Sequence, residues 1–170
     1  YYGICAGAFL ASQTVKGRSR RIDLVPFRDD APEHYRGWGP VNVKLTKEGL
    51  DVFGGSAVRN MMYWGGPVFI PGEPVADTDV VVLGKYNGVR INTRNPKPVK
   101  PMLGKAAFVG GRVGKGKVFL SAPHPEKNEP CVDIVQGIFR YLTGVKPTFL
   151  DLDRKRGAIN VFFKTGKKEA

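Results

Sequence analysis

Cysteine is scarce in this chain, which has only Cys5 and Cys131 among its 170 residues. Two cysteines cannot build the disulfide framework of a small secreted domain, and neither has the spacing or the neighbouring histidines of a zinc site. We therefore expect no bound metal and no other cofactor. Each cysteine has to be explained by its own surroundings.

Long apolar runs are also missing. No stretch approaches the roughly 20 apolar residues that a membrane-spanning helix requires. The opening sequence, YYGICAGAFLAS, lacks the basic region with which a signal peptide begins. We expect no membrane association; the compartment is left open, with the cytoplasm favoured.

Acidic residues are few, with 15 Asp and Glu against 27 Lys and Arg and a formal net charge of +12. Such an excess of positive charge suits a polyanionic partner. The last twenty residues hold six Lys or Arg and three Asp or Glu, and the remaining charge is spread along the chain rather than gathered in a block. Nucleic acid is therefore ranked last among the partners considered.

The length and the hydrophobic content of 42% favour one globular domain, placed at residues 1–150, with residues 151–170 as a basic C-terminal extension. The hydrophobic pattern predicts both strands and helices. Strands are expected at residues 1–5, 22–27, 41–46, 79–85, 106–109 and 118–120, two shorter ones between 60 and 70, and helices from residue 6 and at 131–142. The run at 79–85 is the best candidate for a central strand, and the proline-rich segment 95–101 for an exposed loop.

The predicted strand at residues 1–5 leads directly into a helix. A buried strand that feeds such a turn normally lies in the middle of a sheet, with neighbours on both sides. No strand precedes it in the printed sequence. We therefore expect an upstream segment of the same protein to complete the sheet.

The turn between this strand and helix reads Gly3-Ile4-Cys5-Ala6-Gly7, which fits the nucleophile-elbow pattern. Glycines on either side of the nucleophile allow a tight turn without a clashing Cβ. The turn places the thiol at the start of the helix, where unpaired N–H groups favour a thiolate, and the amide of Ala6 could donate to an oxyanion. The five-residue pattern alone is equally compatible with a buried, inert cysteine.

A second motif lies late in the chain. The sequence Leu120-Ser121-Ala122-Pro123-His124-Pro125-Glu126 follows a predicted strand and puts an imidazole and a carboxylate two residues apart. This spacing lets the carboxylate orient the histidine ring, as the third member of a catalytic triad must.

Together the two motifs resemble the class I glutamine amidotransferase-like superfamily, in which a G-x-C-x-G elbow is joined late in the chain by a strand ending in HPE. The segments GICAGAFLAS, RGWGPV, YWGGPVF and GKGKVFLSAPHPE look more specifically like the amino-terminal domain family of biotin-protein ligases, over roughly residues 1–145. The resemblance implies a flavodoxin-like three-layer α/β sandwich with a mainly parallel sheet. It also implies that Cys5 is the nucleophile, His124 its base and Glu126 the residue that orients His124.

Two features depart from the family pattern. Glutamine-hydrolysing members have Gln four residues after the cysteine, and here that position is Phe9, so glutamine is not the expected substrate. A second oxyanion donor comes in the family from a glycine-rich loop that would precede Tyr1. We expect Phe9 to contact a different small amide or acyl compound.

Aromatic residues beside glycine turns are candidates for the walls of the substrate pocket. They are the aromatics Trp38, Tyr63 and Trp64, together with the turn glycines Gly65 and Gly66. The alternative is that these aromatics belong to the core. Cys131 is expected to pack against the sheet.

For function, the first expectation is a cysteine-dependent amidohydrolase or amidotransferase, and the second a binding or regulatory domain of the same fold without turnover.

Overall fold

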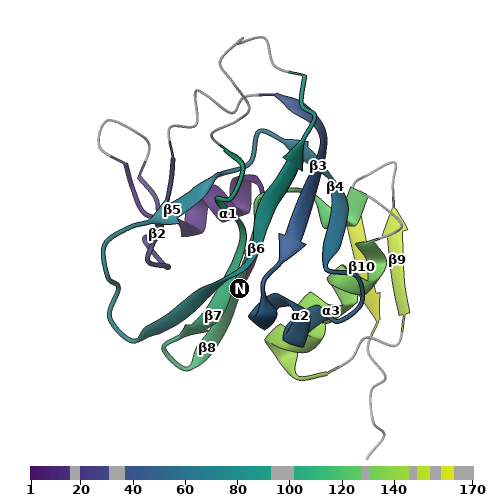
Figure 1. Ribbon diagram of the computed structural model, residues 1–170. Coiled ribbons are helices and arrows are strands. Elements are labelled where there is room, and N and C mark those ends of the chain that lie inside the picture. The colour runs from purple at the N-terminus through teal and green to yellow at the C-terminus, as the bar shows by residue number, and fades with distance from the viewer. Residues whose placement is uncertain are drawn as a thin grey trace, which may run out of the picture.

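The computed structural model describes residues 1–15, 20–30, 37–92, 102–127, 131–145, 149–153 and 158–162, the last two ranges for the backbone alone. Within these residues the chain is an α/β fold with a mixed, curled sheet of eight strands and three α-helices (Figure 1). The strands of this sheet are β1 (Tyr2–Ile4), β2 (Phe27–Asp29), β3 (Trp38–Leu45), β4 (Val58–Trp64), β5 (Phe69–Pro71), β6 (Thr78–Val89), β7 (Ala106–Val113) and β8 (Gly116–Ser121).

The spatial order of the main strands is β1-β8-β7-β6-β3-β4, with β5 beside β7 and β2 beside β5. The other elements are helices α1 (Ala6–Ala11), α2 (Lys47–Phe53) and α3 (Val132–Thr143), the 3-10 turn η3 (Pro125–Lys127), and a separate antiparallel pair of β9 (Phe149–Asp153) and β10 (Ala158–Phe162). Of the described helices, none has the length and apolar character needed to span a bilayer.

The expectation of a mainly parallel sheet is wrong for the described strands. Only β1 and β8 pair in parallel, and all other neighbouring strands of the sheet are antiparallel. A parallel neighbour needs a long crossover connection, whereas β7 and β8 are joined by a tight turn and β3 and β4 by a short segment that contains α2. The connections along most of the chain are therefore those of an antiparallel sheet.

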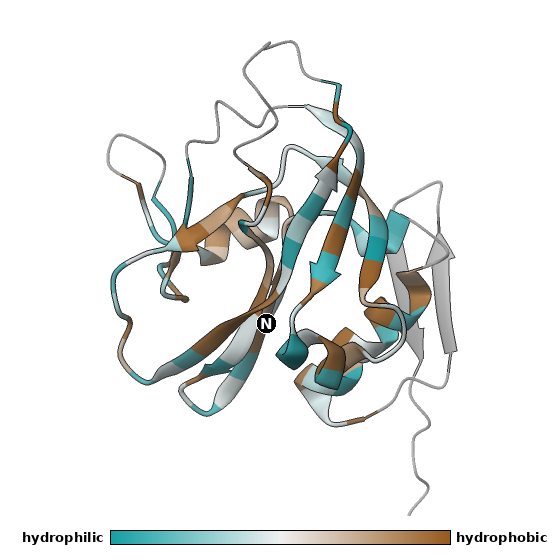
Figure 2. Ribbon diagram, in the orientation of Figure 1, coloured by the Kyte–Doolittle hydropathy of each residue, from teal (hydrophilic) through white to brown (hydrophobic). Residues whose placement is uncertain are grey.

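Several local predictions are confirmed. The strand at 1–5 followed by a helix appears as β1 and α1, the strands at 106–109 and 118–120 as β7 and β8, and the helix at 131–142 as α3. The run at 79–85 lies within β6, which has neighbours on both sides. Alternation in β3 buries Val41, Val43 and Leu45 and exposes Lys44, as a half-exposed strand should. Figure 2 shows the alternating hydropathy along β3.

The strand expected at residues 22–27 is wrong in all but its last residue. The backbone N–H groups of Ile22 and Leu24 donate to the carbonyls of Leu10 and Ala11, at 2.9 Å each, and Asp23 has a positive φ of 49°. The segment thus satisfies its polar groups against the end of α1. Pairing with a sheet strand begins only at Phe27, in β2.

Helix α2 was not expected from the sequence. Its seven residues are too few to show a clear hydrophobic period, but its ends carry helix-capping residues. The side chain of Thr46 accepts a hydrogen bond from the N–H of Gly49, and Gly54 ends the helix with φ 67°. Gly49 is required by packing, because a Cβ there would lie 1.9 Å from the carbonyl oxygen of Leu83.

The sheet curls until the segment after β8 reaches the outer edge of β4. The N–H of His124 donates to the carbonyl of Met62 at 2.7 Å, and the N–H of Ala122 donates to Ala107 at 3.0 Å. Gly66, just beyond β4, packs directly on Ala122. The two ends of the strand order are therefore brought together at one corner of the molecule.

We predict that Gly66→Ala destabilises the protein by about 2 kcal/mol, because the new Cβ would lie 2.1 Å from the carbonyl oxygen of Ala122 and force the closure apart. Gly116→Ala is the control, since its Cβ would have an ordinary contact at 3.6 Å, and it should change the free energy of unfolding by less than about 0.5 kcal/mol. Urea unfolding of both variants measures the difference. Equal stability of the two variants would contradict the closure.

Candidate functional site

Cys5 lies in the turn between β1 and α1. It has φ 49° and ψ −104°, a conformation that residues other than glycine rarely adopt. Its N–H donates to the carbonyl of Ser121 in β8 at 2.9 Å, and its carbonyl accepts from the N–H of Phe9 at 3.0 Å. The sheet and the helix together hold the strained turn in place.

The first glycine of the motif is required by this turn. A Cβ on Gly3 would lie 2.8 Å from the backbone of Gly7 and as close to the ring of Tyr1. The turn therefore brings β1 and α1 closer together than a side chain at Gly3 would permit. The thiol of Cys5, which is partly exposed, contacts the carbonyl oxygen of Trp64 at 3.6 Å.

His124 and Glu126 form a bonded pair beside this turn. The Nδ1 of His124 lies 2.6 Å from Oε1 of Glu126, and both side chains are largely buried, at 15% and 8% exposed. The η3 turn folds the chain back after His124, which is how two residues only two apart can direct their side chains toward one another. The backbone of His124 is fixed in turn by Met62 in β4.

The second ring nitrogen of His124 is left for Cys5. Among the described residues Nε2 is buried and has no partner that meets hydrogen-bond geometry. Burial by itself would lower the pKa of His124, but the polar groups of Cys5 and Glu126 raise that pKa to about 9. The backbone contacts put the two residues at the same corner, since the thiol of Cys5 contacts Trp64 and the N–H of His124 bonds to Met62, two residues earlier in β4.

The expected pocket walls separate into two groups. Trp38 and Trp64 are 54% and 62% exposed, and they are direct partners across β3 and β4. Gly65 turns the chain after them with φ 68°. Phe9 is partly buried and has the guanidinium of Arg21 over its ring, 5.2 Å from the centroid.

Tyr63 does not line an open pocket. It is fully buried, because alternation along β4 turns residues 61 and 63 toward the core and residues 62 and 64 outward. Its hydroxyl donates to the carbonyl of Gly66 at 2.7 Å. Tyr63 and Gly66 thus support the turn that carries Trp64, and the expectation of Tyr63 as a wall is wrong.

Cys131 packs against the sheet as expected. It is 1% exposed and its Sγ donates to the carbonyl of Asn60 at 3.3 Å. Burial, followed by the charge of Asp133, raises its pKa to about 11 against a lowering influence of Arg59. A thiol held in its protonated form is a poor nucleophile.

Three supporting groups were missed by sequence reasoning. The carbonyls of Ser121 and Met62 hold the backbones of Cys5 and His124, and backbone contacts leave no signal in residue type. The hydroxyl of Tyr2 is buried, and burial, with a smaller influence of the Glu126 charge, raises its pKa well above the ordinary value.

Comparison with known proteins gives one match. The family model described as "Biotin-protein ligase, N terminal" matches residues 34–156, which is well over half of the chain. The matched span contains His124 and Glu126, whereas Cys5 lies before it. No curated protein and no solved structure matches the chain significantly.

We predict that stability decreases between about pH 6.5 and pH 9, because a raised histidine pKa stabilises the folded state most fully below the unfolded value of about 6.5. The contribution is lost as pH rises through the folded value of about 9. Cys5→Ala should shift the folded pKa downward and flatten this decline. Proton NMR titration of the two histidines, assigned with His34→Gln, and urea unfolding across the range measure both effects. A His124 resonance that titrates near pH 6.5 in both the wild type and Cys5→Ala would contradict the influence of Cys5 on the pKa of His124.

Proposed function

The chain belongs to the biotin-protein ligase N-terminal family, and on that premise we propose that it is a cysteine-dependent hydrolase-like or amidotransferase-like protein acting on an amide or a related acyl compound. In this proposal it is a member of the class I glutamine amidotransferase-like superfamily. Cys5 is the nucleophile, His124 the base and Glu126 the residue that orients the base.

The observation that supports the proposal is the pairing of Glu126 with Nδ1 of His124 at the corner of the molecule where Cys5 also lies. Glu126 occupies Nδ1 of the imidazole, which leaves the buried Nε2 for the thiol. The raised pKa of His124, about 9, means that near neutral pH the ring is protonated, which favours a thiolate at a neighbouring cysteine. The strained backbone of Cys5 also supports a functional role, since strain of this kind is concentrated at active sites.

The proposed reaction begins from a Cys5 thiolate whose proton is held by Nε2 of His124, so that the ring is an imidazolium. The thiolate attacks the acyl carbon, and the electrons of the C=O double bond move to the oxygen. The N–H of Ala6, the residue after the nucleophile, donates a hydrogen bond to this oxyanion. The tetrahedral intermediate collapses as the C–N bond breaks, and the imidazolium returns its proton to the departing amine. Water, activated by the now neutral His124, releases the acid from the thioester; an amine in place of water would give transfer.

The substrate in this proposal is a small amide or acyl compound other than glutamine. Phe9 stands where glutamine-hydrolysing relatives have a polar contact, and its ring is partly covered by Arg21. The exposed rings of Trp38 and Trp64 supply apolar surface near the thiol, because Trp64 contacts Cys5 through its own carbonyl. An apolar substituent next to the acyl group fits these surroundings best.

The flavodoxin-like arrangement is also part of this proposal. Among the described strands, β1 has a parallel partner only in β8, so that one of its edges has no described neighbour. A further parallel strand at that edge would put the turn at Cys5 in the middle of a sheet, where such turns normally lie.

A second candidate function is a binding or regulatory domain that keeps this arrangement but does not turn substrate over. The observation in its favour is Phe9, which lacks the polar group expected for glutamine hydrolysis. It differs from the first candidate in one measurable respect. A binding domain needs no reactive thiol, so its ligand affinity would not depend on Cys5.

We predict that iodoacetamide at pH 7 modifies Cys5 at least about tenfold faster than Cys131, because Cys131 is buried and has a pKa of about 11. His124→Asn should slow the modification of Cys5 by a similar factor, since the imidazole accepts its proton. Cys131→Ser is the control and should leave the rate at Cys5 unchanged. Peptide mapping by mass spectrometry measures both sites, and equal rates at the two cysteines would contradict the proposal.

We also predict that a panel of small amides and thioesters will contain compounds that acylate Cys5, detected as a mass increase on its peptide. Cys5→Ala should abolish the adduct and turnover, and Glu126→Gln should lower kcat by about tenfold or more with little change in KM, because it disturbs the orientation of His124 rather than binding. Ligands that bind equally well to the wild type and to Cys5→Ala, without any adduct or product, would favour the second candidate.

A further inference from the structure

One face of the sheet carries polar, basic and aromatic side chains, and its basic residues have no role in the proposed chemistry. We define it as the β4-β3-β6 face, formed by the outward side chains of these three strands. Its members are Trp38, Pro40, Asn42 and Lys44 from β3, Val58, Asn60, Met62 and Trp64 from β4, and Lys85, Asn87 and Arg90 from β6 and the residue after it. All of them except Asn42 and Met62 are exposed, and those two are half-buried.

The charge of this face has one sign. Lys44 and Lys85 are direct partners across β3 and β6, and Arg90 follows further along β6, where its N–H donates to the carbonyl of Pro40 at 3.0 Å. No carboxylate stands among the members of the face. Like charges directly opposite one another destabilise a sheet, so a bound polyanion would offset a cost that the free protein bears.

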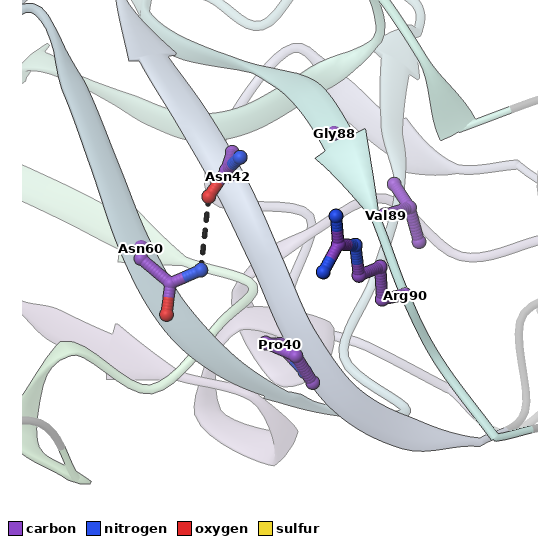
Figure 3. A pocket seen from close by; sticks show the side chains of 6 residues that line it. All are labelled: Pro40, Asn42, Asn60, Gly88, Val89 and Arg90. Atoms are coloured by element: carbon purple, nitrogen blue, oxygen red, sulfur yellow. Dashed lines mark hydrogen bonds between the residues drawn. The ribbon is translucent and has the colours of Figure 1, made fainter.

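Two hollows are lined by residues of the paired strands β3 and β6. The first, of about 370 Å³, is lined by Asn42, Asn60, Gly88 and Arg90 among others, and the second, of about 410 Å³, by Lys44, Lys85 and Asn87 among others. Figure 3 shows the guanidinium of Arg90 on the side of β3, with Asn42 and Asn60 hydrogen-bonded on the neighbouring strands at 2.9 Å. The first hollow exists because Gly88 has no side chain; a Cβ there would lie 3.0 Å from Asn42.

Aromatic rings end the face on the side of the thiol. Trp38 and Trp64, partners across β3 and β4, are more than half exposed, which is unusual for indole rings in a polar sheet surface. They are also the only two tryptophans of the chain. Exposed rings beside a basic groove are the elements with which proteins bind single-stranded nucleic acid, the bases stacking on the rings and the phosphates following the cations.

We propose that the β4-β3-β6 face binds single-stranded nucleic acid. The two tryptophans stack bases, and Lys44, Lys85 and Arg90 contact phosphates. Lys44 lies six residues after Trp38 along β3. The distance between them is about 20 Å, which accommodates a short single strand. A duplex hides its bases from the tryptophans, so the face discriminates against it.

The test is titration of the chain with labelled single-stranded oligonucleotides and with a duplex of the same sequence, followed by fluorescence anisotropy. We expect single strands to bind in the range of about 1–100 µM at low salt, with log affinity falling against log salt at a slope near −2 for three phosphate contacts. Tryptophan emission should be quenched on binding, because both tryptophans lie in the face. Trp38→Ala should weaken binding about tenfold.

A matched pair of double variants locates the site. Lys44→Ala with Lys85→Ala should weaken binding and reduce the salt slope to about −0.7, whereas Lys115→Ala with Lys117→Ala removes the same charge from the exposed tip of the β7-β8 hairpin and should not. Cys5→Ala should bind as the wild type does, which separates this proposal from the thiol chemistry. Equal loss in both double variants, binding without quenching, or preference for the duplex would each overturn the proposal.

Discussion

Closure of the curled sheet is the constraint on which the candidate site depends. The segment after β8 bonds to β4 through His124 and Met62, and β8 bonds to the turn at Cys5 through Ser121. Neither Cys5 nor His124 would be in place without these backbone contacts. Because the contacts join the two ends of the strand order, the packing of the whole sheet decides the position of a few side-chain atoms.

The electrostatics of the site follow from this closure. Burial disfavours a charged imidazole, yet Glu126 on one ring nitrogen and Cys5 near the other raise the pKa of His124 to about 9. The same packing holds Cys5 in a backbone conformation that is costly for any residue but glycine, by a cost of about 1–3 kcal/mol. The fold thus maintains both a strained turn and a buried polar pair, and both occur at the same place.

The distribution of charge shows how the fold changes the meaning of composition. Along the sequence the basic residues are spread, and nucleic acid ranked last among the partners considered. Strand pairing places Lys44 opposite Lys85, brings Arg90 to the same groove, and puts both tryptophans at its end. A surface that no segment of the sequence displays is created by three strands lying side by side.

The sequence by itself determined the local features: the strand and helix around Cys5, the H-x-E spacing, the β7-β8 hairpin, the late amphipathic helix and the buried character of Cys131. Each depends on glycine positions or on a hydrophobic period within a few residues. Tertiary structure alone decided the antiparallel pairing of most strands, the inward orientation of Tyr63, the bonding of residues 22–24 to α1 and the backbone contacts that hold Cys5 and His124. These features depend on which distant backbone groups satisfy one another, and residue type carries little information about such pairings.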